Sequence, residues 1–222
     1  MMKINNPENH TYIPALKYQW LTRFYDPILN LTMPEKQFKS ELIKQAAIKP
    51  NHHVLDFGCG SATLSLMVKM MKPQTVIRGV DVDAKNVEIA KRKIGNVHAD
   101  IYIDKYDGVV LPYADNSFDR VISSLVFHHL DAGQKANSFT EIKRVLKPGG
   151  ELHIADWGKP SNMAMRSAFY FVQFLDGFKT TADNVKGLLP AYMTDVGFQD
   201  VTNTNHFNTI FGTLRLMKAT KQ

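Results

Sequence analysis

An acid and a pair of glycines follow the first apolar run of the chain, where a helical pattern begins. Val54–Thr63 reads Val-Leu-Asp-Phe-Gly-Cys-Gly-Ser-Ala-Thr, which places Asp56 near the end of the run and Gly58 and Gly60 just after it. A buried strand that turns through glycine into a helix presents backbone N–H groups at one mouth, where a ligand can approach the main chain closely. This arrangement suits a nucleotide-like ligand, although a glycine pair also occurs in ordinary strand-to-helix turns.

A second acid stands at the end of the next apolar run. Val76–Asp81 reads as a strand, and Asp81 lies 25 positions after Asp56 (81 minus 56), with a helix expected over 64–71 between them. A carboxylate at the tip of the second strand of such a unit can accept hydrogen bonds from both hydroxyls of a ribose. Taken alone, Asp81 is more typical of a solvated surface charge than of a ligand-binding residue, so its position at a strand end is what indicates a binding role.

Two later segments continue the alternation of strands and helices. Asp107–Pro112 leads into a turn and a buried strand over 116–124. Glu141–Gly150 reads as a helix end with a Pro-Gly stop, and it feeds a strand over Glu151–Asp156. Four spaced elements in this order are more specific than one glycine turn.

Over residues 36–157 the chain resembles the class I S-adenosylmethionine-dependent methyltransferases. It is most similar to the branch that methylates small molecules, including quinone precursors, which share the Leu-Pro, Asn-Ser-Phe-Asp and Lys-Pro-Gly-Gly signatures. The resemblance implies S-adenosylmethionine as cofactor and a Rossmann-like α/β fold. That fold has a seven-stranded, mostly parallel sheet in the order 3-2-1-4-5-7-6, with helices on both faces and an antiparallel seventh strand between strands five and six.

The resemblance also implies which residues surround the methionine part of the cofactor. Asp56, Gly58, Gly60 and Ser61 match the loop around that end. Ser124, at the end of the fourth strand, matches a position close to it.

The adenosine part has its own matching residues. Asp81 matches the acid that binds the ribose, and Val82 the apolar side chain that lies against the adenine. Asp107 matches the acceptor of a hydrogen bond from the adenine amino group, and Gly108 supplies a backbone N–H to the ring. Ala62 departs from the fullest glycine pattern at the third small position, which is a mild change.

A nicotinamide or flavin dehydrogenase is the alternative for the glycine loop, because the same strand-turn-helix geometry binds a diphosphate. The dinucleotide fingerprint has a third glycine or alanine where this chain has Thr63. Asp56 would repel a diphosphate but attract the ammonium group of S-adenosylmethionine. The sign of that charge favours the sulfonium cofactor.

The expected reaction is an in-line displacement at the sulfonium methyl group, for which alignment and exclusion of water can suffice. If the acceptor needs a base, His128 and His129 are the candidates, because they directly follow the fourth strand at the active edge. The alternative is that the pair caps a helix or holds a loop. We predict no metal, since His153 lies on another strand and no acid completes a helical ligand spacing.

We expect one methyltransferase domain over residues 1–222. An aromatic-rich arm over 1–33 and an insertion over 158–190 are expected to cap the acceptor, although their aromatic side chains can instead serve only to pack the cap. The expected strands lie near 53–57, 76–81, 100–104, 119–124 and 151–156, with a closing pair over 201–207 and 212–219. The expected helices lie near 34–48, 61–72, 84–94, 133–147, 161–178 and 181–195.

Composition narrows the class of protein. The 222 residues, 44% of them hydrophobic, are enough for one α/β core. A single cysteine excludes an intramolecular disulfide, and no apolar run is long enough to span a membrane, so we expect a cytoplasmic protein. The net charge of +6 raises the question of nucleic acid, but no binding module accompanies it.

The leading hypothesis is therefore a methyltransferase acting on a small, apolar or aromatic acceptor. The alternatives are a non-catalytic S-adenosylmethionine-binding regulator and, less favoured, an RNA methyltransferase.

Overall fold

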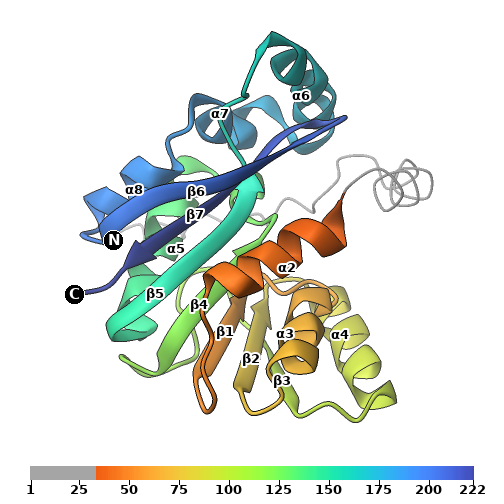
Figure 1. The fold of residues 1–222 in the computed structure, drawn as a ribbon, viewed down its shortest axis with the longest axis vertical. Helices are drawn as coiled ribbons and strands as arrows, with labels where there is room; N and C mark the ends of the chain where they lie inside the picture. The colour runs from red at the N-terminus through yellow and green to blue at the C-terminus, as the bar shows by residue number, and fades with distance from the viewer. Residues whose placement is uncertain (1–33) are drawn as a thin grey trace, which may run out of the picture.

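Seven strands form one sheet in the order β3-β2-β1-β4-β5-β7-β6 in the computed structural model, which describes residues 34–222 (Figure 1). β1 to β5 run parallel to one another, and β7 lies antiparallel between β5 and β6. This order confirms the prediction. The strands are β1 His53–Phe57, β2 Val76–Asp81, β3 Ile101–Lys105, β4 Phe118–Ser124, β5 Leu146–Trp157, β6 Gln199–Thr209 and β7 Gly212–Thr220.

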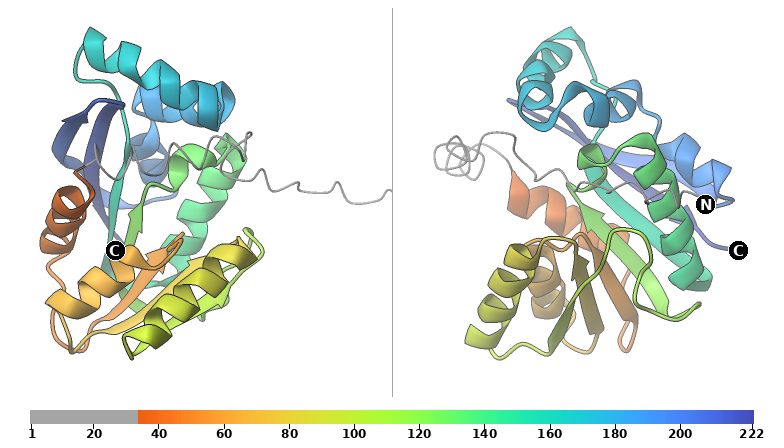
Figure 2. Two further views of the ribbon diagram at one scale, coloured as in Figure 1. Left: turned by 90° about the vertical axis from the view of Figure 1, so that its right-hand side faces the viewer. Right: turned by 180° about the vertical axis from the view of Figure 1, so that it is seen from behind.

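Helices cover both faces of the sheet (Figures 1 and 2). One apolar cluster packs α2, α3 and α4 against the sheet, and another packs α5 and α8 against the opposite face. Because neighbouring residues of a strand point to opposite faces, Val54 belongs to the first cluster and Leu55 to the second. The helices are α2 Glu35–Gln45, α3 Thr63–Met71, α4 Ala84–Asn96, α5 Ala132–Val145, α6 Met163–Asp176, α7 Phe178–Lys186 and α8 Leu189–Asp195, with a 3-10 turn η1 at Phe127–His129.

The segment over 181–195, predicted as one helix, is two. α7 ends before Gly187, whose φ of +74° is the left-handed conformation that glycine adopts readily at a helix end. The chain then restarts at Leu189 with Pro190 in the first turn of α8, where the missing N–H of proline is tolerated. The Gly-Leu-Leu-Pro sequence over 187–190 is typical of such a break between two helices.

Several element boundaries also differ from the prediction. α2 ends at Gln45 rather than near 48, and β5 begins at Leu146, so it includes the Lys-Pro-Gly-Gly segment that was expected to lie before the strand. The early part of β5 stays in the sheet because Phe118 of β4 pairs with Leu146 across an irregular register.

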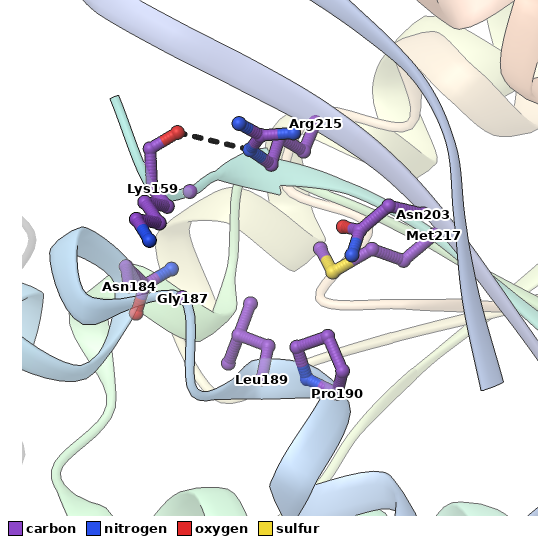
Figure 3. A pocket seen from close by; sticks show the side chains of 9 residues that line it. Lys159, Asn184, Gly187, Leu189, Pro190, Asn203, Arg215 and Met217 are labelled. Carbon is purple, nitrogen blue, oxygen red and sulfur yellow. Dashed lines mark hydrogen bonds between the residues drawn. The ribbon is translucent and has the colours of Figure 1, made fainter. Parts of the chain in front are cut away.

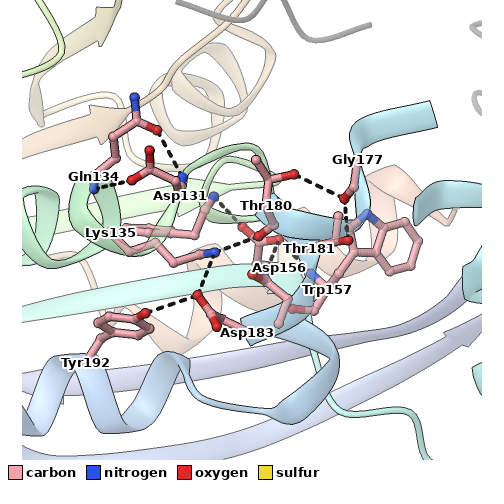
Figure 4. A network of polar contacts seen from close by, with 12 residues as sticks. Asp131, Gln134, Lys135, Asp156, Trp157, Gly177, Thr180, Thr181, Asp183 and Tyr192 are labelled. Carbon is pink, nitrogen blue, oxygen red and sulfur yellow. Dashed lines mark hydrogen bonds and ion pairs between the residues drawn. The ribbon is translucent and has the colours of Figure 1, made fainter. Parts of the chain in front are cut away.

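A buried lysine joins α5 to the segment that follows β5. Lys135 is fully buried, and its ammonium group donates to the carbonyl of Thr180 at 2.7 Å and pairs with Asp183 at 3.4 Å (Figure 4). Tyr192 of α8 donates its hydroxyl to the same carboxylate at 3.0 Å. Since a buried charge is tolerated only when it is paired and hydrogen-bonded, these contacts position α7 against α5.

The helices of residues 34–222 are all too short or too polar to cross a membrane. The predicted arm over 1–33 lies outside the described residues.

Candidate active site

The parallel strands bring the predicted site segments to one edge of the sheet. Phe57 at the end of β1 pairs with Val80 of β2 and Ser123 of β4, and Ser124 pairs with Ala155 of β5. The carboxyl ends of these four strands are therefore level with one another. In open α/β sheets this is the edge where ligands bind.

The glycine turn after β1 adopts left-handed backbone conformations at three positions. Gly58, Gly60 and Ala62 have φ values of +68°, +51° and +60°. A Cβ on Gly58 would lie 2.4 Å from a methyl carbon of Val126, so that position is closed by the loop after β4. A Cβ on Gly60 would meet no atom within 4 Å. The backbone at Gly60 therefore faces open space that a ligand can use.

Asp81 ties the glycine turn to the end of β2. Its Oδ2 accepts the backbone N–H of Gly60 at 2.8 Å, and its Oδ1 accepts that of Asp83 at 2.9 Å. The N–H of Gly60 is thus already bonded, so it is not one of the backbone N–H groups expected to be available to a ligand. The N–H of Ser61 has no acceptor within residues 34–222. A carboxylate accepts about four hydrogen bonds, so Asp81 keeps capacity for ligand hydroxyls.

Asp56 lies behind the turn and is 1% exposed. Burial raises its pKa to about 6, although Ser65 donates a hydroxyl hydrogen bond to it at 2.6 Å and Lys39 contributes a positive charge. Loss of hydration disfavours the charged form of a buried carboxyl group. A cation bound near Asp56 would therefore lower its pKa and favour the ionised carboxylate.

The adenine-side residues predicted from the sequence also lie together. Gly108 has a φ of +84°, and a Cβ there would lie 3.5 Å from a methyl of Val82. Asp107 accepts the backbone N–H groups of Val109 and Val110 at 2.8 and 2.9 Å through one oxygen. These hydrogen bonds lower the pKa of Asp107. Its second carboxylate oxygen has no partner in the described part of the chain.

Ser124 ends β4 with an unsatisfied hydroxyl. Its Oγ is buried and has no hydrogen-bond partner among residues 34–222. An orphaned buried hydroxyl is unfavourable unless a ligand or ordered water completes it. The orphan hydroxyl and the open space beside Gly60 are what a cofactor binding along this edge requires, so the residues fit the group that the sequence implies.

His128 is buried between two carboxylates. Its Nδ1 lies 2.8 Å from Oδ1 of Asp156, and its Nε2 lies 3.7 Å from Oδ2 of Asp176. Burial alone would lower the pKa of His128, but the charge and hydrogen bond of Asp156 and the charge of Asp176 outweigh it and raise the pKa above its ordinary value. The backbone N–H groups of Val126 and Phe127 bind the other oxygen of Asp156 and fix the loop.

His129 has the opposite electrostatic environment. Desolvation of its ring and the neighbouring His128 hold the pKa of His129 well below its ordinary value, so its imidazole is neutral near pH 7. The ring centroids of the two histidines are 3.9 Å apart. The His129 ring nitrogens have no hydrogen-bond partner in the part of the chain described. Of the two candidates, His129 is therefore the one with a free nitrogen lone pair.

The tertiary structure supplies an acid that the sequence reasoning missed. Single ligand atoms of His128, His129 and Asp176 lie within 4.8 Å of one another. The sequence argument against a metal considered acids at helical spacing from the histidines, and Asp176 lies outside that spacing. The absence of a metal remains a prediction.

Asp176 and Asp156 escaped prediction for different reasons. Asp156 ends a strand beside the site, a signal that was visible in the sequence. Asp176 ends α6, 48 residues beyond His128 (176 minus 128), and only the folded structure shows that its Oδ2 lies 3.7 Å from Nε2 of His128.

The insertion over 158–190 forms α6 and α7 beyond the end of β5 (Figure 1). Phe169 packs edge-on against Trp157 with ring centroids 5.4 Å apart, while Phe174 and Phe178 are exposed. Part of its aromatic content therefore packs the segment against the sheet, as the simpler interpretation expected.

Comparisons with known proteins agree with this geometry. The family described as "Methyltransferase domain" matches residues 54–150. Demethylmenaquinone methyltransferase of Lactobacillus johnsonii is 30% identical over 169 residues, which are 72% of this chain and 68% of that protein. Ubiquinone/menaquinone biosynthesis C-methyltransferase UbiE of Pseudoalteromonas translucida is 25% identical over 190 residues, covering 76% and 74%.

Among solved structures, a SAM-dependent methyltransferase from Aquifex aeolicus superposes with a TM-score of 0.64 at 21% identity, covering 91% of this chain and 97% of that chain. At that identity the likeness shows the fold alone. The sequence relatives, together with the sheet order and the glycine edge, show that this chain belongs to the S-adenosylmethionine-dependent methyltransferases and is an enzyme of that class.

Proposed function

We propose that the enzyme transfers a methyl group to a small, apolar or aromatic acceptor that enters between the glycine edge and η1. The observation that carries this proposal is the difference between the two histidines after β4. His128 lies between the carboxylates of Asp156 and Asp176, whereas the neutral ring of His129 keeps a free nitrogen lone pair. A reduced quinone ring is the acceptor class we favour, because the relatives at 25% and 30% identity are named for quinone methylation.

The cofactor lies, in this proposal, along the edge from Ser124 to Asp107. Asp81 binds the ribose, while Val82 and Gly108 flank the adenine. The free carboxylate oxygen of Asp107 accepts a hydrogen bond from the adenine amino group. Orientation of this kind can supply roughly 7–11 kcal/mol of the barrier reduction for a well-aligned transfer.

The methionine end would face Asp56, Gly58, Gly60, Ser61 and Ser124. S-adenosylmethionine supplies an electrophilic methyl group whose leaving group is a neutral thioether. The ionised carboxylate of Asp56 attracts the ammonium group from behind the turn. The unpartnered hydroxyl of Ser124 gains a hydrogen bond.

His129 is the proposed proton acceptor. Methylation of a reduced quinone ring breaks the methyl–sulfur bond, forms a carbon–carbon bond and releases one proton from the acceptor. The neutral imidazole of His129 can accept the hydroxyl proton that activates the ring. His128 is a positioning residue, because Asp156 and Asp176 occupy both of its nitrogens.

The insertion over 158–190 is proposed as the cap of the acceptor site. α7 packs on η1, so the cap and the histidines are in contact. Closing this side would exclude water from the reacting atoms. The arm over 1–33 would contribute from the other end of the chain.

Gly60→Ala is expected to leave the fold intact and to weaken S-adenosylmethionine binding about tenfold. The new methyl meets no protein atom within 4 Å but occupies the space assigned to the ligand. Isothermal titration gives the affinity, and thermal unfolding checks the fold.

Gly149→Ala is the matched control. Its φ of +74° is similarly left-handed and its Cβ also meets nothing within 4 Å, but it lies in the early part of β5, away from the site. It should lose about the same stability, roughly 1 kcal/mol, and keep its affinity. Equal affinities for the two variants would contradict the proposed cofactor position.

Cofactor affinity should fall with decreasing pH. The pKa of Asp56 is about 6 in the free protein, and an ammonium group beside it would lower that pKa in the complex. Binding near pH 6 therefore releases a proton, and affinity should drop about tenfold between pH 7 and pH 5. Titration calorimetry in buffers of different ionisation enthalpy measures the proton count. Asp56→Asn should bind weakly at pH 7 without this pH dependence; a parallel pH dependence in the variant would rule out Asp56 as its source.

The acceptor class is tested by turnover to S-adenosylhomocysteine. Reduced 1,4-naphthoquinone and reduced 1,4-benzoquinone should support turnover, whereas an RNA oligomer should not. Turnover with RNA alone would replace the proposed acceptor with nucleic acid. No turnover with any phenol, quinol or amine would favour the alternative of a binding protein and contradict this proposal.

A further inference from the structure

A cavity lies away from the glycine edge, between the α7–α8 connection and strands β6 and β7 (Figure 3). Its volume is about 180 Å³. Leu189 and Met217 are buried in its wall, whereas Lys159 and Asn203 are exposed at its rim. None of the residues proposed to bind S-adenosylmethionine lines it.

The rim carries two positive charges without a matching acid. Lys159 and Arg215 both line the cavity, and none of its lining residues is acidic. The Nε of Arg215 donates to the carbonyl of Lys159 at 2.9 Å, but neither side chain has an ion pair within residues 34–222. Two such cations at one opening attract an anion, since unpaired like charges favour a counter-ion between them.

Gly158 and Gly187 leave room for the side chains of Arg215 and Lys159 to pack against the backbone. A Cβ on Gly158 would lie 2.7 Å from Cδ of Arg215, and one on Gly187 would lie 3.1 Å from Cβ of Lys159. The side chains of Arg215 and Lys159 therefore lie directly over glycine backbone. Larger residues at these positions would displace both cations.

The buried wall contains an unsatisfied acceptor. Asn184 is fully buried, and its Nδ2 donates to the carbonyl of Trp157 at 2.9 Å and to Asp156 at 3.4 Å. Its Oδ1 has no hydrogen-bond partner in the described chain. A buried acceptor without a partner is destabilising, and a ligand with a donor group can relieve this cost.

We propose that this cavity binds a small organic anion that carries a carboxylate, an apolar body and a hydroxyl donor. The carboxylate pairs with Arg215 and Lys159 at the rim, and the body packs on Leu189 and Met217. The hydroxyl donates to Asn184 in the wall. A cavity of roughly 150 Å³ accommodates a benzene ring, so the size suits one substituted ring.

The site would also communicate with the histidine cluster. Asn184 contacts Asp156, and Asp156 holds His128. A donor bound at Oδ1 fixes the amide that contacts Asp156. The contact from Asn184 through Asp156 to His128 would transmit the effect of a bound anion. Binding of the anion itself does not require a methyl acceptor.

The test measures binding to the full chain without any methyl acceptor. The probes are 3- and 4-hydroxybenzoate, with benzoate lacking the donor and phenol lacking the charge. Titration calorimetry should show at least one hydroxybenzoate binding tenfold more tightly than benzoate and phenol. Arg215→Gln and Lys159→Gln should each weaken it at least fivefold.

Lys179→Gln is the control, because Lys179 is an exposed lysine of α7 that does not line the cavity. It should leave hydroxybenzoate affinity unchanged. Equal weakening by Lys179→Gln would indicate general charge attraction and overturn the proposal, as would no binding to the wild-type chain. Gly60→Ala should bind hydroxybenzoate normally, which separates this site from the cofactor site.

Discussion

Replacing Asp81 with alanine is expected to weaken S-adenosylmethionine binding by about 100-fold. In the proposed binding mode the variant loses two hydrogen bonds from the ribose to a charged acceptor, each contributing about 1.5–3 kcal/mol before water compensates. It also releases the N–H groups of Gly60 and Asp83, which loosens the glycine turn. Since about 1.4 kcal/mol changes affinity tenfold, isothermal titration resolves this loss easily.

Asp81→Asn separates these two contributions. Its amide oxygen can still accept one hydrogen bond, so its affinity should lie between those of the wild type and the alanine variant. Asp104→Ala is the matched control, because Asp104 lies near the end of β3 and pairs with Arg78 and Tyr113 instead. An affinity of folded Asp81→Ala within twofold of the wild type would show that the ribose assignment is wrong.

Replacing His129 with glutamine is expected to lower kcat by about 100-fold or more and to leave S-adenosylmethionine affinity within twofold. A positioned general base typically contributes roughly 10²–10⁴ to a rate, and glutamine cannot accept the proton. The measurement is S-adenosylhomocysteine formation with the best acceptor of the quinol panel, at saturating cofactor.

His128→Gln and His206→Gln test whether this effect is specific. His206 lies on β6, exposed and away from the cluster, so its variant should keep the wild-type rate. His128→Gln removes the cation that lowers the pKa of His129, so it should shift the pH profile of kcat toward higher pH as well as lower the rate. An unchanged rate in His129→Gln would leave alignment alone as the source of catalysis.

Much of the sheet was predictable because its signals are local. β1 and β2 are short apolar runs, and both lie at the residues expected. The order of the strands came from the family resemblance and is confirmed. The split of the helix over 181–195 was also local, and Gly187 marked it.

The hydrogen bonding of the glycine turn could not be predicted from the sequence. Spacing placed Gly60 and Asp81 at neighbouring strand ends, and they are in contact. It did not show that the carboxylate already binds the N–H of Gly60. A hydrogen bond between two predicted site residues depends on the atomic distance, which spacing alone leaves open.

The amino-acid sequence by itself determined the fold class and the cofactor, because the motifs that carry the family resemblance are contiguous stretches of the chain. Only the tertiary structure decided the different electrostatic environments of His128 and His129. These adjacent residues have opposite pKa shifts because Asp156 and Asp176, distant in the chain, pair with one ring and leave the other beside a positive charge. Charge interactions and loss of hydration depend on distances in space, and packing of α6 and α7 sets those distances.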